Sequence, residues 1–192
     1  WVYSWLVWNG PIYEFPAIFI LPRDLIYLGA MARISCVIFD LDGTLADTGR
    51  LIFASFNHIA ERYTGRAWTE DEILATFGPT EEVAIREIVG EANAPEAIEA
   101  FHEFYAERHE AMAAEHGGMR EVLAYLRSHE VVLALFTGKG KRATAVTLQA
   151  LGMDQVFDLL VAGDDVEEHK ASSEGIRKVL STFALTPHSA LM

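Results

Sequence analysis

The apolar positions along this chain switch between strand-like and helical patterns, and the switches predict its elements. Residues 37–39 form a short apolar run that stops at a turn signal, as buried strands do. From residue 52 the apolar side chains recur at helical spacing, which ends near Gly65. Three further helices are predicted from their start signals: a capping box at 69–72 opening a helix to Phe77, Thr80 as the N-cap of 81–89, and Pro95 opening a helix to about His116.

From residue 119 onward, helical and strand patterns alternate regularly. The predicted order is helix 119–130, strand 131–136, helix 141–151, a strand near 159–162, helix 173–183 and the beginning of a strand at 190–192. This βα repetition favours an α/β fold with a doubly wound parallel sheet. The helices before it would form an inserted unit, so we expect residues 31–46 and 117–192 to make the core and residues 47–116 to make the insertion.

The charge of the chain argues against nucleic-acid binding. Its formal net charge is −13, and so acidic a protein is a poor partner for phosphate backbones. The insertion carries most of this charge, because residues 47–118 hold 15 acidic residues and 5 arginines with no lysine. Long-range steering would therefore oppose an anionic substrate, and its binding must depend on local donors and a metal ion.

The first thirty residues differ in composition from the rest, with three tryptophans and three prolines. Charged residues at 14, 23 and 24 interrupt the apolar runs, so the segment fails as a membrane helix, and it lacks the basic start of a secretory signal. We expect residues 1–30 to be an apolar extension foreign to the rest of the chain; alternatively, they pack on the core as a flap. Cys36 is the only cysteine, which excludes an internal disulfide and suits a reducing cytoplasm.

Two carboxylates, Asp40 and Asp42, follow the first predicted strand, and Gly43 lets the chain turn away after them. The strand would deliver both acids to its carboxyl end, where ligands bind in open α/β sheets. Carboxylates this close need a cation or a shared proton, and a carboxylate nucleophile that forms an aspartyl-phosphate is established phosphoryl-transfer chemistry. The alternatives are an accidental acidic turn or a calcium loop. An EF-hand loop does not fit, because Gly43 is fourth rather than sixth from Asp40 and the twelfth residue is Leu51 rather than Glu.

Three motifs, in order and spacing, resemble those of the haloacid dehalogenase superfamily over about residues 33–192. The first is Asp-x-Asp-Gly-Thr after an apolar strand, here residues 40–44. The second is a threonine that closes another apolar strand, here Thr137, and the third is a lysine some thirty residues later, here Lys170. The segment Phe77-Gly78-Pro79-Thr80 also resembles the substrate-specificity turn of the phosphoglycolate-phosphatase and pyrophosphatase branch.

The resemblance implies a role for each motif residue. Asp40 would attack phosphorus and bind Mg²⁺, which suits hard oxygen ligands and a phosphate. Asp42 would protonate the leaving oxygen, then activate the water that hydrolyses the aspartyl-phosphate, and its backbone carbonyl would be a second metal ligand. The phosphoryl group would be bound by the remaining motif positions, which are Thr137, Lys170, Gly43 and Gly138.

The resemblance further implies a Rossmann-like core with a helical cap that closes over the site and selects the substrate. The function expected is that of a Mg²⁺-dependent phosphatase acting on small phosphorylated metabolites, similar to phosphoglycolate phosphatases. Two alternatives stay open: a phosphomutase of the same superfamily, and a catalytically impaired remnant that only binds phosphate. A dehalogenase is disfavoured, because a halide leaving group has no need of Asp42.

Some residue assignments also stay open. Thr137 could simply cap the following helix, and Lys170 could be an ordinary surface lysine. Ala171 stands where the family most often has proline, so the backbone that holds Lys170 is less constrained. Lys139 or Lys141 could therefore take the role of Lys170.

Two other groups of ionisable residues look structural. His102, His109 and His116 recur every seven residues, a spacing that does not gather three ligands on one ion, and we expect a solvated helix face. Asp164-Asp165 is expected to be a solvated loop. It is therefore no substitute for the family's fourth motif, an acidic pair after a further strand, which does not occur before Met192. We expect the C-terminal part of the core to be missing from this sequence, and the strand at 190–192 to lie beside a central first strand.

Overall fold

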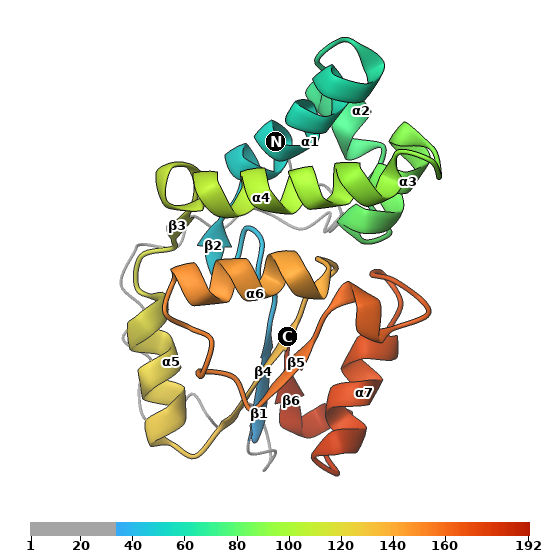
Figure 1. Ribbon diagram of the computed structural model, residues 1–192. Coiled ribbons are helices and arrows are strands. Elements are labelled where there is room, and N and C mark those ends of the chain that lie inside the picture. The colour runs from blue at the N-terminus through green and yellow to red at the C-terminus, as the bar shows by residue number, and fades with distance from the viewer. Residues whose placement is uncertain (1–33) are drawn as a thin grey trace, which may run out of the picture.

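The computed structural model describes residues 34–192, and its centre is a four-stranded parallel sheet (Figure 1). The strand order is β5–β4–β1–β6, so the first strand is central as expected. The strands are β1 (Cys36–Phe39), β4 (Val132–Phe136), β5 (Leu159–Val161) and β6 (Ala190–Leu191). Cys36 pairs with Ala190, which confirms the predicted neighbour of the first strand. The predictions for residues 1–30 lie outside the described residues.

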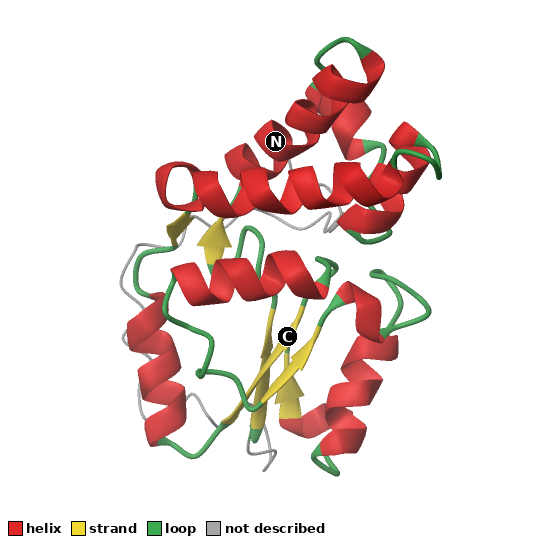
Figure 2. Ribbon diagram, viewed as in Figure 1, coloured by secondary structure: helices red, strands yellow, loops and turns green. Residues whose placement is uncertain are grey.

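Alternate side chains of the strands enter two separate apolar cores, as expected when both faces of a sheet are covered. Val37 and Phe39 pack with α5 (Met119–Ser128) and with the end of α6 (Lys141–Ala150). Cys36 and Ile38 pack on the other face, against α7 (Glu174–Thr182). Figure 2 shows helices on both sides of the strands. The predicted doubly wound α/β core is confirmed.

Four helices follow one another between residues 49 and 112 and pack around an apolar core of their own (Figure 1). They are α1 (Gly49–Thr64), α2 (Glu70–Leu74), α3 (Glu81–Val89) and α4 (Ala94–Met112). Gly65 ends α1 in the left-handed conformation, and the capping box predicted at Thr69 is formed, although α2 ends at Leu74 rather than Phe77. We call these four helices the helical insertion.

A short antiparallel pair of strands joins the helical insertion to the core, and the sequence pattern did not predict it. The strands are β2 (Ala46–Asp47) and β3 (Ala114–Glu115). Because the chain becomes extended in β3, α4 ends at Met112, and the prediction that this helix reaches His116 is wrong. The backbone N–H of His116 instead donates to the carbonyl of Leu45 at 3.0 Å. Strands of two residues carry no periodicity that a sequence pattern could reveal.

The histidine face of α4 is buried, so the expectation of a solvated face is wrong. His102 and His109 each expose only 3% of their surface, because this face of α4 packs on α6 and α3. Burial is the largest cause that lowers the pKa of both imidazoles, which favours their neutral form. The seven-residue spacing therefore places both histidines on the face of α4 that contacts α3 and α6, two helical turns apart.

Gly175 allows α7 to lie close to β4, and we expect Gly175→Ala to lower the free energy of unfolding by about 1–3 kcal/mol. A Cβ atom there would lie 2.2 Å from Cε2 of Phe136, whose ring is buried and cannot move away freely. Urea unfolding measures the change. The matched control is Gly117→Ala, where a Cβ meets nothing within 4 Å and the change should stay within about 0.5 kcal/mol. Equal effects of the two variants would contradict the packing argument.

Candidate active site

The carboxyl ends of β1 and β4 place two of the motif residues at one edge of the sheet. Phe39 of β1 is in register with Leu135 of β4, so Asp40 and Thr137 each follow directly after neighbouring parallel strands. The backbone N–H of Thr137 donates to Val161 of β5 at 3.0 Å, which ties this edge to the third strand. Ligands of open α/β sheets bind at such an edge.

Lys170 reaches this edge and forms an ion pair with Asp40. Its Nζ lies 2.8 Å from Oδ1 of Asp40, and the same oxygen accepts a hydrogen bond of 2.8 Å from the backbone N–H of Leu41. The ammonium also lies 4.9 Å from the ring centroid of Phe136, at the end of β4. With 27% of its side chain exposed and these contacts, Lys170 is not the free surface lysine of the alternative interpretation.

Both carboxylate oxygens of Asp42 have partners. Oδ1 accepts a hydrogen bond from Oγ1 of Thr48, the residue between β2 and α1. Oδ2 lies 3.3 Å from Nζ of Lys139. The two acids of the first motif thus pair with different cations, Asp40 with Lys170 and Asp42 with Lys139.

Lys139 is the buried cation of the site, with 1% of its side chain exposed. Its Nζ is 3.3 Å from Asp42 and also 3.3 Å from Oε1 of Glu81, at the start of α3. The ring of Tyr105, a residue of α4, lies below it at 4.9 Å. Burial by itself lowers the pKa of Lys139, but the two carboxylates and Tyr105 outweigh it and raise the pKa well above its ordinary value. Lys139 therefore carries its charge inside the boundary between core and helical insertion.

Thr137, Gly138 and Gly43 shape the loops around these acids. Thr137 is 1% exposed, and its Oγ1 accepts a hydrogen bond of 3.2 Å from the backbone N–H of Lys139. The alternative that Thr137 caps the next helix is wrong, because the N-cap of α6 is Gly140. Gly43 adopts φ of 75°, a left-handed conformation that favours glycine, and its N–H donates to Ala46 at 2.8 Å.

Lys141 and the acidic pair before the third motif form a separate cluster. Lys141 lies 2.7 Å from Asp165, so it does not compete with Lys170 for Asp40. Asp164 accepts a hydrogen bond from the backbone N–H of Lys141, and Asp165 accepts one of 3.1 Å from Ala162. Asp164 is exposed, as expected for a solvated loop, but Asp165 is partly buried and residues 163–165 form a short 3₁₀ helix after β5. A second 3₁₀ helix, Pro187–Ser189, precedes β6.

Sequence reasoning missed three residues that complete the site. Thr48 binds Asp42, Glu81 binds Lys139, and Tyr105 lies under Lys139 with its hydroxyl 2.8 Å from Oγ1 of Thr147. Thr48 could have been found from its place six residues after Asp42, beside the turn of the first motif. Glu81 had no such signal, because an acid in the first turn of a helix is common for reasons of helix stability alone.

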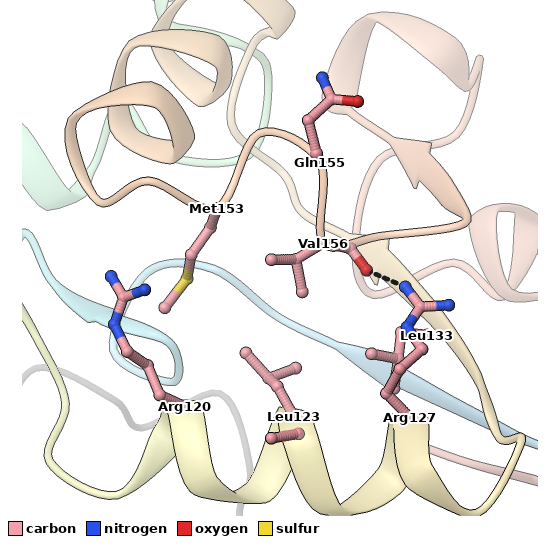
Figure 3. A pocket seen from close by; sticks show the side chains of 8 residues that line it. Arg120, Leu123, Arg127, Leu133, Met153, Gln155 and Val156 are labelled. Atoms are coloured by element: carbon pink, nitrogen blue, oxygen red, sulfur yellow. Dashed lines mark hydrogen bonds between the residues drawn. The ribbon is translucent and has the colours of Figure 1, made fainter.

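A separate cavity of about 300 Å³ lies away from these acids, between α5 and the loop after α6 (Figure 3). Arg120 and Arg127 flank an apolar floor that includes Leu123, Met153 and Val156. Both arginines already have partners: Arg120 pairs with Glu115 at 2.7 Å, and Arg127 pairs with Asp158 at 2.7 Å and donates to the carbonyl of Val156. None of the motif residues lines this cavity, so the candidate site is the sheet edge.

Comparison with known proteins agrees with the motifs. The sequence model described as haloacid dehalogenase-like hydrolase matches residues 37–192. The chain is 31% identical over 160 residues to the pyrophosphatase PpaX of Bacillus cereus strain G9842, covering 83% of this chain and 74% of that protein.

Solved structures share the same fold. A predicted phosphoglycolate phosphatase from Haemophilus somnus superposes with a TM-score of 0.71 at 20% identity, over 84% of this chain and 76% of the other. CbbY from Rhodobacter sphaeroides, solved in complex with phosphate, superposes with a TM-score of 0.71 at 23% identity, over 82% of this chain and 76% of the other.

Proposed function

The chain belongs to the haloacid dehalogenase-like hydrolase family, and from this premise we propose that it is a Mg²⁺-dependent phosphatase of small phosphorylated metabolites, similar to phosphoglycolate phosphatases. The observation that carries the proposal is the 2.8 Å contact between Lys170 Nζ and Asp40 Oδ1, at the sheet edge where Thr137 also lies. A carboxylate nucleophile needs a nearby cation when an anionic phosphoryl group approaches it, and Lys170 supplies that cation.

In the proposed reaction, a carboxylate oxygen of Asp40 attacks phosphorus and the ester oxygen leaves with a proton donated by Asp42. Asp42 then takes a proton from a water molecule, which attacks the aspartyl-phosphate. The bond between phosphorus and Asp40 breaks and inorganic phosphate leaves. Thr137 and the N–H of Gly138 would bind the phosphoryl oxygens, and Gly43 would keep the turn after Asp42 open to them.

The donors near Asp40 fit the magnesium ion that the family implies. Mg²⁺ prefers oxygen ligands and is held in proteins by one or two carboxylates together with substrate phosphates. The Asp40 carboxylate and the backbone carbonyl of Asp42 would hold the ion, and 37% of the Asp40 side chain is exposed to solvent. Residues 34–192 show no group of three or more histidine, cysteine, aspartate or glutamate residues that could hold a metal by themselves. When bound, the ion would neutralise phosphate charge during transfer.

We also propose that residues 47–116 act as a cap and residues 31–46 and 117–192 as the catalytic core. Two contacts support this division: Glu81 of α3 pairs with Lys139, and Tyr105 of α4 bonds to Thr147 of α6. The start of α3 thus lies against the loop that carries Thr137. A cap in that place would exclude water and select the leaving group.

The proposed cellular location and partner rest on the net charge of the chain and on its buried cysteine. No helix in the described part of the chain is long and apolar enough to cross a membrane. Cys36 is a free cysteine, and burial followed by the charge of Asp158 raises its pKa to about 11, so it stays an unreactive thiol. We propose a cytoplasmic enzyme whose partner is a small phosphorylated molecule rather than a nucleic acid.

Metal removal tests the proposed function. We expect the protein with Mg²⁺ to release phosphate from p-nitrophenyl phosphate, and EDTA to lower that rate by at least about a hundredfold, because the ion supplies several kcal/mol of charge stabilisation. Adding excess Mg²⁺ should restore the rate, whereas Ca²⁺, which prefers more ligands at longer distances, should not. An undiminished rate in EDTA would contradict the assignment of a magnesium enzyme. With a sugar phosphate as the substrate, transfer of the phosphoryl group to another hydroxyl of the sugar instead of to water would indicate a mutase.

A further inference from the structure

Glu81 brings a carboxylate from the cap to the reacting edge of the core. It is the first residue of α3, and only 9% of it is exposed. Its Oε2 accepts a hydrogen bond of 2.7 Å from the backbone N–H of Gly140, and its Oε1 lies 3.3 Å from Nζ of Lys139. One carboxylate therefore binds both an ammonium group and the backbone N–H of the residue that caps α6, and these two donors together form a good site for an anion.

Two core glycines allow this close approach. A Cβ atom on Gly140 would lie 2.9 Å from Oε2 of Glu81, and one on Gly163 would lie 2.7 Å from Cγ2 of Thr80. Both distances are shorter than real Cβ contacts, so a larger residue at either position would crowd the start of α3, and at Gly163 it would also lie 2.4 Å from the carbonyl oxygen of Gly138. Glu81 is thus seated by the shape of the core as well as by charge.

The same ammonium group serves the acid that we propose to protonate the leaving group. Lys139 lies 3.3 Å from Asp42 and 3.3 Å from Glu81, so these two carboxylates share a single buried cation. The next two cations in the sequence, at the start of α6, are also paired, Lys141 with Asp165 at 2.7 Å and Arg142 with Glu99. A leaving group next to Asp42 therefore meets a protonated lysine whose positive charge is already balanced by the carboxylate of Glu81.

We infer that Glu81 selects the leaving group by its charge: by neutralising Lys139 it favours phosphate monoesters whose leaving group is neutral or cationic over those that carry a second anion. This inference rests on the proposed phosphatase function and specifies its substrate class. Opposite charges a few ångströms apart interact strongly in a partly desolvated site, so removing one acid there should change selectivity substantially. The similarity to phosphoglycolate phosphatases then concerns fold and chemistry rather than the charge of the preferred substrate.

Three substrates of matched size test the inference: 2-hydroxyethyl phosphate, phosphoethanolamine and phosphoglycolate, whose leaving groups are neutral, cationic and anionic. For the wild type we expect kcat/KM for phosphoglycolate to be lower than for 2-hydroxyethyl phosphate by about tenfold or more. In Glu81→Gln, where the amide oxygen can still accept from Gly140 but the charge is lost, the ratio should shift toward phosphoglycolate by about tenfold. The kcat/KM for phosphoethanolamine, relative to that for 2-hydroxyethyl phosphate, should fall in the same variant.

Two further variants separate charge selection from general damage. Glu87→Gln removes an exposed glutamate from the same helix and should leave the relative kcat/KM values of the three substrates unchanged. Glu81→Gln combined with Lys139→Gln removes the freed cation, so the gain toward phosphoglycolate should disappear. Glu81→Ala serves as the test variant if Glu81→Gln does not fold, as judged by circular dichroism.

The outcomes distinguish the two levels of the proposal. If the wild type hydrolyses these esters but Glu81→Gln and Glu81→Ala leave the ratio within twofold of the wild type, the inference about Glu81 is overturned and the phosphatase function stands. If the wild type releases phosphate from none of the three esters nor from p-nitrophenyl phosphate, the proposed function is overturned, and the inference falls with it.

Discussion

Asp40→Asn should lower the turnover number by about a thousandfold or more while the protein stays folded. Loss of a covalent nucleophile removes the route through the aspartyl-phosphate altogether, and removal of a nucleophile in other enzymes costs losses of this size or larger. The fold should tolerate the change, because the side chain is 37% exposed and asparagine keeps its shape. Stopped assays of phosphate release measure the loss, and thermal unfolding measures the fold.

A second measurement on the same residue tests its covalent role. Beryllium fluoride should label the wild type at Asp40 in the presence of Mg²⁺ and should not label the asparagine variant. The matched control is Asp154→Asn, an exposed aspartate in the loop before β5, which should retain full activity. Substantial turnover by Asp40→Asn would rule out Asp40 as the nucleophile, and labelling at Asp42 would move the role to that residue.

Lys139→Met should lower the free energy of unfolding by about 3–5 kcal/mol, the largest stability change that we expect from a single substitution here. The variant removes the cation between Asp42 and Glu81 but leaves both carboxylates at the boundary between core and cap. A buried charge without its partner costs far more than the net contribution of the intact pair, because desolvation is no longer compensated. Urea unfolding at neutral pH and low salt measures the change.

Two controls test whether the loss comes from the unpaired acids. Lys141→Met, two residues further along, removes a lysine that is 59% exposed and should cost less than about 1 kcal/mol, as surface ion pairs do. Adding Glu81→Gln to Lys139→Met should recover at least about 1 kcal/mol, since one of the two unpaired charges is gone. If Lys139→Met lowered the free energy of unfolding no more than Lys141→Met does, the argument that unpaired buried acids destabilise the protein would be contradicted.

The element order and the motif residues could be predicted because they depend on local patterns. A short apolar run with a turn behind it predicted β1, and the same reasoning placed β4, β5 and β6. Parallel strands end at a common edge, so Asp40 and Thr137 could be expected near each other without coordinates. Helix ends were less accurate, as at Met112, because the chain leaves α4 to pair with β2 and that pairing has no local signal.

The solvated face expected for the histidines was wrong for a related reason. The seven-residue spacing of His102 and His109 shows that they share a helix face, but not what that face contacts. The contact depends on where the helical insertion lies against α6, which is a property of the whole fold.

What the sequence determined by itself is the fold class, the order of the strands in the chain and the candidate residues of the site, because strand ends and turns follow from neighbouring residues. What only the tertiary structure decided is which cation serves which acid. The motif spacing favoured Lys170 and left Lys139 or Lys141 as competitors, and the structure pairs Lys170 with Asp40 and Lys139 with Asp42 and Glu81. Glu81 and Lys139 are 58 positions apart, and their contact exists because the start of α3 lies close to Gly140 and Gly163 of the core. Ion pairing depends on distance in space, which local sequence patterns do not encode.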